Sequence, residues 1–161
     1  MNPALVPAGE TLPCEPIILP AHSTEYAAVR ALIIQGLTQR WGKYDASSNP
    51  DLEDFADFYS QATVLVAKVG DLIIGCGVLV KEDDTVGRIV RMTVRADHQR
   101  AGVGRKILAA LLAAAKTAGY REVVLETTST WTSAVDFYSA CGFLPSKLES
   151  GDQHFRLVIV D

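Results

Sequence analysis

Residues 88–105 read RIVRMTVRADHQRAGVGR, and this stretch decides the fold of the chain. It begins with a β-prone run at 89–94, passes through a polar turn at 95–98, and then runs past two glycines into a helix with one apolar face. The first N–H groups of a helix lack acceptors within the helix, and the helix dipole adds partial positive charge there. Because Gly102 and Gly104 have no Cβ atom, a phosphate can approach the backbone of this loop closely.

Two common phosphate-binding motifs do not fit this loop. A Walker loop requires Gly-Lys followed by Ser or Thr, whereas Gly104 is followed by Arg105 and Lys106. A dinucleotide-binding fingerprint requires a third glycine, and Ile107 occupies that position. On the loop alone, one alternative stays open, namely that the glycines serve only tight packing at the start of a helix.

The composition is that of an ordinary globular protein, and we expect residues 1–161 to form one domain with an irregular arm at 1–13. The chain has 161 residues, of which 48% are hydrophobic and 21% are charged. Its net charge of −4 argues against nucleic acid as a partner. No apolar run approaches the roughly 20 residues that cross a bilayer, and residues 1–13 do not resemble a signal peptide. The three cysteines, Cys14, Cys76 and Cys141, are widely spaced and form no metal or disulfide pattern, so we expect a reduced, cytoplasmic protein with no membrane partner.

The order of β-prone and helical segments predicts a mixed sheet. Tight turns separate β-prone runs at 63–69, 72–81 and 86–94, which predicts three consecutive antiparallel strands. A helical pattern then runs to Gly119 and a strand follows at 122–127, so this strand should lie parallel to an earlier one. The other expected elements are strands at 15–19, 143–148 and 154–160, and helices from Ser23 or Thr24 to about Gln39, at 50–60 and at 134–140.

The loop and a second, distant segment together resemble the GCN5-related N-acetyltransferase (GNAT) family. The pattern Q-x-x-G-x-G at 99–104, after a strand that ends in Met-Thr-Val, is similar to the loop that holds the pyrophosphate of coenzyme A in that family. The segment from Leu125 to Phe143 is similar to the family pattern L-E-x…A-x-x-x-Y-x-x-x-G-F. The resemblance implies an α/β (α+β) fold with a mixed, mainly antiparallel central sheet of about seven strands and about four flanking helices.

The resemblance also implies a set of residues that bind acetyl-CoA, with no metal. Backbone groups of the strand that ends at Val94 are expected to contact the pantetheine and the acetyl group, although the same residues could simply be buried in the sheet. The expected cofactor-binding residues are Met92, Thr93, Val94, Arg100, Ala101, Gly102, Val103, Gly104 and Arg105. Trp131 departs from the family, because many relatives carry Asn there to help seat the cofactor. Its indole cannot replace an amide acceptor, but its ring could cover the pantetheine.

Tyr138 is the candidate general acid. A phenol with a pKa near ~10 is protonated at neutral pH and can donate to a departing thiolate. The resemblance places this hydroxyl near the sulfur of the cofactor. The alternative is that Tyr138 only packs beside Phe137 and Phe143.

Glu126 is the candidate general base, because relatives that acetylate amino termini carry a glutamate base at this spacing from the tyrosine. Two alternatives are open: Glu126 only pairs with an arginine such as Arg91, or water accepts the proton. The acidic segment at 51–57, together with Asp45, is either a solvated face or a surface that attracts a cationic acceptor.

The leading hypothesis is an enzyme that moves an acetyl group from acetyl-CoA to a primary amine by direct attack in a ternary complex. The acceptor would be a small amine, an amino acid or a protein amino terminus, and a homodimer is left open. The alternative is a non-catalytic module that binds coenzyme A as a sensor or partner subunit. Tyr138 and Glu126 favour the enzyme, since a sensor needs neither residue.

Overall fold

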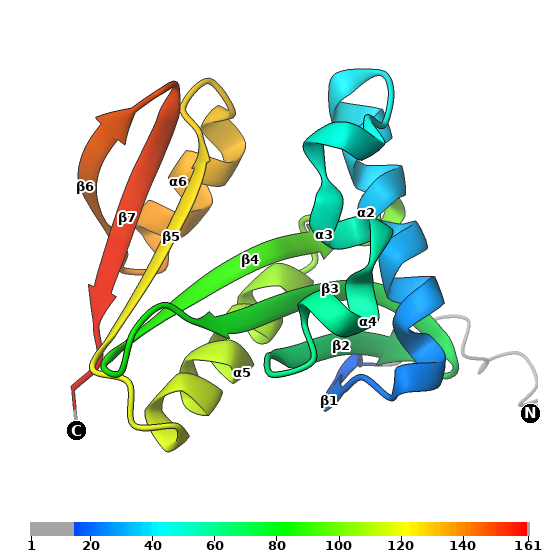
Figure 1. Cartoon of the computed structure of the whole chain (residues 1–161), viewed down its shortest axis with the longest axis horizontal. Helices are drawn as coiled ribbons and strands as arrows, with labels where there is room; N and C mark the ends of the chain where they lie inside the picture. Colours follow the sequence, from blue (N-terminus) through cyan, green and yellow to red (C-terminus); the bar gives the residue numbers. More distant parts are fainter. Residues whose placement is uncertain (1–14, 161) are drawn as a thin grey trace, which may run out of the picture.

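The structure is a computed structural model that describes residues 15–160, so the arm predicted at 1–13 lies outside the described residues. It contains one seven-stranded sheet with the strand order β1-β2-β3-β4-β5-β7-β6 (Figure 1). The strands are β1 Ile17–Pro20, β2 Thr63–Val69, β3 Leu72–Lys81, β4 Val86–Val94, β5 Glu122–Thr128, β6 Leu144–Glu149 and β7 Asp152–Val158. The α-helices are α2 Tyr26–Trp41, α3 Pro50–Glu53, α4 Phe55–Phe58, α5 Val103–Thr117 and α6 Thr132–Ala140.

The prediction of a mixed, mainly antiparallel sheet of about seven strands is confirmed. Strands β1 to β4 pair antiparallel, β5 pairs antiparallel with β7, and β4 with β5 is the parallel pair. The described residues hold five α-helices rather than four, because the helix predicted at 50–60 is broken at Asp54, whose φ of −141° and ψ of 57° are not helical. The predicted cap of α2 at Ser23 or Thr24 is wrong, since these residues form a 3₁₀ turn and Glu25 stands at the cap position.

The central feature of the sheet is that β4 and β5 pair over only three residues each. Val86–Arg88 pairs with Glu122–Val124, and no further pairing follows. Beyond this point the half that holds β5, β7, β6 and α6 diverges from the half that holds β1 to β4 (Figure 1). We call the region between residues 89–94 of β4 and residues 125–128 of β5 the split. In the part of the chain that the structure describes, the facing edges of these two strands have no strand partner there.

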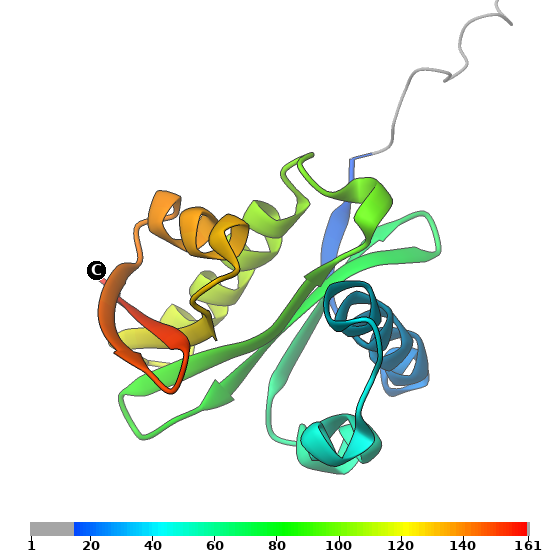
Figure 2. The same cartoon turned by 90° about the horizontal axis from the view of Figure 1, so that it is seen from above.

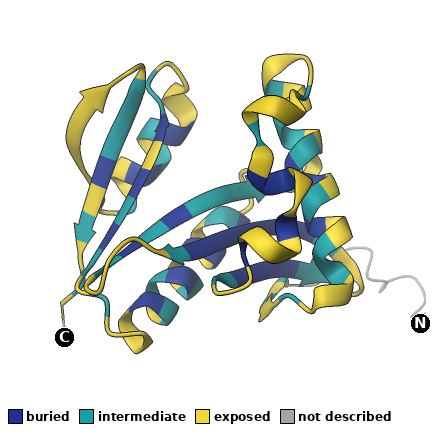
Figure 3. Cartoon of the chain, viewed as in Figure 1, coloured by how far each residue is buried: buried dark blue, intermediate teal, exposed yellow. Residues whose placement is uncertain are grey.

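Two hydrophobic clusters hold the fold together, one on each face of the sheet. Helix α5 buries the side chains of Ile107, Leu108 and Leu111, which recur at helical spacing, against one face. Helix α2 covers the opposite face with Val29 and Ile33 (Figure 2). Each fully buried aliphatic side chain stabilises the folded state by about 1.5–3 kcal/mol. Strand β6, by contrast, is exposed along its whole length (Figure 3).

Candidate active site

The loop before α5 turns sharply because two of its residues adopt left-handed backbone conformations. Arg100 has φ 65° and Gly102 has φ 85°, and α5 then begins at Val103. Glycine adopts such a conformation at little cost, whereas other residues lose roughly 1–2 kcal/mol. The side-chain amide of Gln99 donates through Nε2 to the carbonyl oxygen of Val94 at 3.0 Å. This hydrogen bond ties the loop to the end of β4.

The loop offers a run of free backbone donors. Within residues 15–160, none of the six backbone N–H groups from Arg100 to Arg105 donates to a protein acceptor, whereas the N–H of Lys106 donates to the carbonyl oxygen of Gly102 at 3.1 Å. Consecutive N–H groups at a turn and at the start of a helix bind anions. The side chains of Arg100 and Arg105 are exposed beside them.

Close packing does not explain the two glycines. A Cβ atom on Gly102 would meet nothing within 4 Å, and one on Gly104 would lie 3.5 Å from the ring of Phe137 and 3.8 Å from Val94. Both distances are ordinary contacts, so the alternative that these glycines serve tight packing has no support. Gly104 also lies where the start of α5 meets β4 and α6, so the loop opens beside the split.

A β-bulge interrupts β4 at Arg91. The pairing steps from Val78 with Val90 to Cys76 with Thr93, and Arg91 has φ 57°. Two residues of β4 therefore face one residue of β3, which bends the strand. On the facing strand β3, Gly75 and Gly77 allow α5 to approach closely, because a Cβ atom on either would lie 2.8 Å from Ile107 or Leu111.

The direction of the β4 backbone beyond the bulge fits two of the predicted contacts. The N–H of Arg95 donates to the carbonyl oxygen of Ile74 at 2.8 Å, so alternate residues of this segment face β3. Met92 and Val94 therefore direct their backbone groups toward the split. Thr93 faces β3 instead, and its methyl group lies 3.1 Å from the position of a Cβ atom on Gly36. A backbone contact from Thr93 to a cofactor has no support in this geometry.

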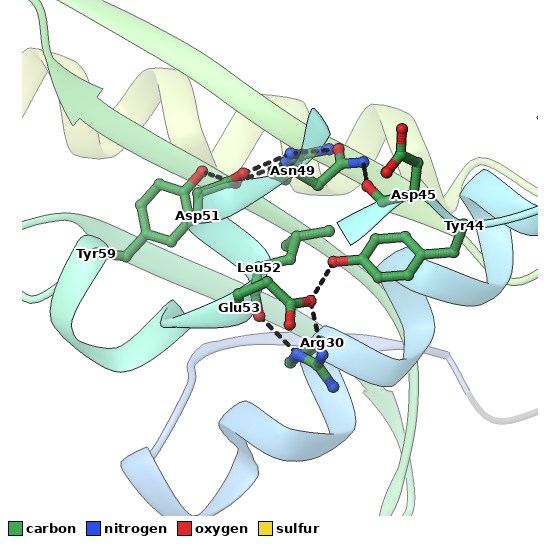
Figure 4. Close-up of polar contacts among 9 residues, drawn as sticks. Arg30, Tyr44, Asp45, Asn49, Asp51, Leu52, Glu53 and Tyr59 are labelled. Atoms are coloured by element: carbon green, nitrogen blue, oxygen red, sulfur yellow. Dashed lines mark hydrogen bonds and ion pairs between the residues drawn. The ribbon is translucent and has the colours of Figure 1, made fainter. Parts of the chain in front are cut away.

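Arg91 anchors the bulge to α3 through the buried carboxylate of Asp51, which Figure 4 shows beside Tyr59. Its Nε and Nη2 atoms lie 2.9 and 2.7 Å from the two carboxylate oxygens of Asp51, and the Tyr59 hydroxyl donates to the same carboxylate at 2.5 Å. Burial acts to raise the pKa of Asp51, but the hydrogen bonds from Arg91 and Tyr59 outweigh it, so the pKa lies below its usual value. The sequence did not reveal this network.

Other acids that the sequence offered as a surface for a cationic acceptor are also engaged. Asp45 accepts hydrogen bonds from the backbone and hydroxyl of Ser47 at 3.0 and 2.7 Å. Glu53 accepts from the Tyr44 hydroxyl at 2.6 Å and from Arg30 at 3.1 Å (Figure 4). These acids hold the segment between α2 and α4 in place. The hypothesis that the segment attracts a cationic acceptor therefore loses its main support.

Tyr138 lies inside the aromatic core at the side of α6. It is 8% exposed, and its ring centroid lies 5.1, 5.9 and 6.1 Å from those of Phe137, Phe143 and Phe155. Burial and the neighbouring Cys141 raise the pKa of Tyr138 above its usual value. The hydroxyl is therefore protonated throughout the neutral range. The packing alternative is correct as far as the ring is concerned, and it leaves the hydroxyl free for a further role.

Glu126 forms an ion pair with Arg88, not with Arg91. The Arg88 guanidinium bonds Glu126 through Nη1 and Glu82 through Nε, the latter at 2.8 Å. Arg88 is the last residue of β4 that pairs with β5. The ion pair therefore crosses the sheet where the split begins. The Glu126 side chain is 41% exposed.

Trp131 marks the other end of the same half of the sheet. It precedes α6, is 42% exposed, and its N–H donates to the carbonyl oxygen of Thr128 at 3.0 Å. The loop lies beside Val94 and Phe137, whereas Glu126 contacts Arg88 and Trp131 contacts Arg40. Within residues 15–160, no group of three or more His, Cys, Asp or Glu side chains could hold a metal ion. No described helix is both long and apolar enough to cross a membrane.

A sequence model of the Acetyltransferase (GNAT) family matches residues 27–143, so the chain belongs to this family. It is 29% identical to N-acetyltransferase 8F1 of Rattus norvegicus over 128 residues, which cover 74% of this chain and 58% of that protein. The chain spans about half the length of the curated relatives it matches. In three of these relatives the match covers 58%, 44% and 50% of the relative's own length.

Solved structures show the same fold at low sequence identity. An acetyltransferase of the GNAT family from Staphylococcus aureus Mu50 is 20% identical, with a TM-score of 0.79 over 90% of this chain and 99% of that one. The PaiA N-acetyltransferase of Thermoplasma acidophilum is 14% identical, with a TM-score of 0.77 over 89% and 99%, and was solved in complex with coenzyme A. The family and fold that the sequence predicted are therefore confirmed.

Proposed function

We propose that this protein transfers the acetyl group of acetyl-CoA to the nitrogen of a primary amine. The observation that carries the proposal is the run of six free N–H groups at the start of α5, beside a sheet whose β4 edge is open. The first feature fits the phosphates of coenzyme A and the second fits its amide-bearing arm. Membership of the GNAT family and the fold shared with a structure that holds coenzyme A support the same cofactor.

In the proposed reaction the neutral amine attacks the thioester carbon directly. A C–N bond forms, the C–S bond breaks, the nitrogen gives up one proton and the thiolate of coenzyme A takes one up. The carbonyl oxygen gains charge during this step, so a fixed donor near it lowers the barrier. We assign this donor to the backbone after the bulge, where Met92 and Val94 face the split. The contact from Arg91 to Asp51 would keep that backbone in place.

Tyr138 is proposed to stabilise the departing thiolate. Thiols have a pKa of about 8.5, whereas burial keeps the pKa of Tyr138 above its ordinary value of about 10. Complete proton transfer from the phenol to the sulfur is therefore unfavourable. A hydrogen bond from the hydroxyl to the thiolate is favourable without such a transfer. This hydrogen bond acts mainly in the transition state. The final proton would then reach the sulfur from solvent.

Glu126 is proposed to accept the proton of the amine through a water molecule. It lies on β5 at the start of the split, and its side chain is open to solvent. Its ion pair with Arg88 opposes this role, because accepting a proton would weaken that pair. Solvent water without Glu126 is therefore the competing base.

A screen of primary amines tests the proposed function. Purified protein is incubated with acetyl-CoA and one amine at a time, free thiol is measured, and the acetylated amine is identified by mass spectrometry. Thiol release that depends on the amine supports the proposal. Binding of coenzyme A in calorimetry without transfer to any amine would favour the sensor instead.

A further inference from the structure

Both tryptophans of the chain converge on one arginine. Arg40 lies in the last turn of α2, and its guanidinium carbon is 3.6 Å from the ring centroid of Trp131 and 4.6 Å from that of Trp41. The two rings are 42% and 57% exposed. Stacking of a guanidinium on an indole ring is attractive by about 0.5–2 kcal/mol.

The contact between Arg40 and Trp131 crosses the split. Helix α2 packs on the half of the sheet that holds β3 and β4, whereas Trp131 precedes α6 on the other half. The C-terminal end of α2 and the loop from β5 to α6 both lie at the open end of the split (Figure 1). The ion pair of Arg88 with Glu126 crosses the closed end. The backbone edges of β4 and β5 lie between these two contacts.

The guanidinium of Arg40 is stacked on its face, while its edge is free. Within residues 15–160, no hydrogen bond or ion pair engages its N–H groups, and none of its side-chain nitrogens is fully buried. Burial lowers the pKa of Arg40, and the charge of Asp152 opposes this effect without a direct contact. A guanidinium presents its edge as a planar fork that matches a carboxylate or a phosphate. Stacking on the indole fixes the plane of that fork in advance.

Position decides between a carboxylate and the phosphates of the cofactor. The donors for phosphate stand at the start of α5, where Gly104 lies next to Phe137. Trp131 is six residues before Phe137 in the chain, which corresponds to about 9 Å along a helix axis. Arg40 lies in the last turn of α2, not on α5 or in the loop before it. We therefore assign an anion bound at Arg40 to the acceptor rather than to the cofactor.

We infer that Arg40, held against Trp131, binds a carboxylate of the acceptor, so that the acceptors are amino acids or other amines that carry a carboxylate. This inference rests on the proposed function, because it names the acceptor class of the same site. A rival occupant is a cationic acceptor that displaces Arg40 from between the two rings. The free edge of Arg40 favours the carboxylate.

Matched acceptor pairs test the inference. Each pair is an L-amino acid and its carboxamide, which differ only in the carboxylate. We expect kcat/KM for the free amino acid to exceed that of the amide by at least ~10-fold in the wild type, since charge-assisted hydrogen bonds are the strong ones. Amidation lowers the pKa of the amine and so favours the amide chemically, which means that nucleophilicity cannot produce this preference.

The variants locate the effect. Arg40→Gln should remove the preference by lowering kcat/KM for the free amino acid at least ~10-fold, with little change for the amide. Arg40→Lys keeps the positive charge but not the planar fork of donors. Its preference for the free amino acid should lie between that of the wild type and that of Arg40→Gln. Lys43→Gln removes a nearby exposed cation and serves as the matched control, with the preference kept. Calorimetry should give the same Kd for coenzyme A in the wild type and in Arg40→Gln.

Several results would overturn the inference while leaving the proposed function intact. The wild type could prefer the amide, or Arg40→Gln could lose the same factor in kcat/KM for both acceptors. Weaker coenzyme A binding in Arg40→Gln would instead assign Arg40 to a phosphate. A binding assay tests the same inference without any turnover.

The complex of the protein with coenzyme A should bind N-acetyl-L-amino acids with a lower Kd than their carboxamides, and Arg40→Gln should abolish this difference in Kd. No difference in the wild type would contradict the inference even if no amine is acetylated.

Discussion

Arg91 and Asp51 join a bulge in β4 to the short helix α3 through two contacts of 2.9 and 2.7 Å. Their side chains are only 20% and 10% exposed. Arg91 sits in a left-handed conformation that a residue other than glycine rarely adopts, so its backbone needs support from elsewhere. The carboxylate of Asp51 supplies that support. The pair therefore links the segment between α2 and α4 to the strand that faces the split.

Removing the charge of Asp51 should destabilise the protein. Asp51→Asn leaves the guanidinium of Arg91 without its counter-charge in a largely buried site, and breaking such a pair costs about 3 kcal/mol. For a chain of this size we expect Tm to fall by about 6–12 °C in a thermal melt. Asp57→Asn, which removes an exposed acid nearby, should leave Tm nearly unchanged. Equal stability of Asp51→Asn and wild type would show that the pair does not hold α3 to the bulge.

The same pair predicts how stability changes with pH. The pKa of Asp51 is lowered in the folded state, so its contribution is complete above the unfolded value of about 3.9 and is lost as the pH falls through the folded value. In urea titrations, the gap in unfolding free energy between wild type and Asp51→Asn should be wide at pH 7 and narrow below pH ~4. A gap that stays constant down to the most acid pH tested would assign the effect of the substitution to packing.

The phosphate loop can be tested at Gly104 without straining the backbone. A Cβ atom there makes only ordinary contacts, whereas Gly102 has φ 85° and resists any side chain. Gly104→Glu should abolish coenzyme A binding, because a carboxylate would occupy the phosphate seat. Gly104→Ala adds only a methyl group and serves as the control for folding. Calorimetry is the measurement, and an unchanged Kd in folded Gly104→Glu would refute the site.

How much the sequence could reveal depended on how local each signal was. Two β-prone runs and the turn at Gly70-Asp71 predicted β2 and β3 correctly, because both signals lie within a few residues of the strands. The bulge at Arg91 was missed, since its side chain is fixed by Asp51, forty residues away in the chain. The partner of Glu126 was missed for the same reason. Arg88 meets it only because β4 and β5 pair at their beginnings.

For Trp131 the sequence predicted only a departure from the family pattern and a ring that could cover the pantetheine, not a contact with α2. Its partner Arg40 lies in a helix whose apolar face predicted only core packing. A contact between two exposed side chains on separate halves of the sheet has no pattern in either segment. The loop at 99–104 was the opposite case, because its glycines and the following helix are local signals that predict an anion site.

Glu126→Gln tests the base. If Glu126 accepts the proton of the amine, the variant should lose turnover chiefly at low pH, where little amine is neutral without help. Its Kd for coenzyme A should stay nearly unchanged. The measurement is a pH–rate profile under saturating acetyl-CoA. A profile that superimposes on that of the wild type would remove Glu126 from the mechanism and leave water as the base.

Tyr138→Phe separates a chemical role from packing. Phenylalanine keeps the ring contacts with Phe143 and Phe155, so Tm should change little. Loss of the hydrogen bond to the thiolate should lower kcat at least ~10-fold, without a matching rise in KM. The readouts are thiol release at saturating acceptor, a thermal melt and a coenzyme A titration. Normal turnover, or a loss of rate that follows a loss of Tm, would mean that the tyrosine only packs.

The most direct test of the central claim is the stoichiometry of transfer by the wild-type protein. Acetyl-CoA and one amine that is active in the screen are incubated with the protein, and free thiol and N-acetylated amine are quantified together. We predict one acetylated amine for each thiol released, and loss of both signals in Gly104→Glu. Thiol release without acetylated amine, or equal transfer by the wild type and folded Gly104→Glu, would contradict the account.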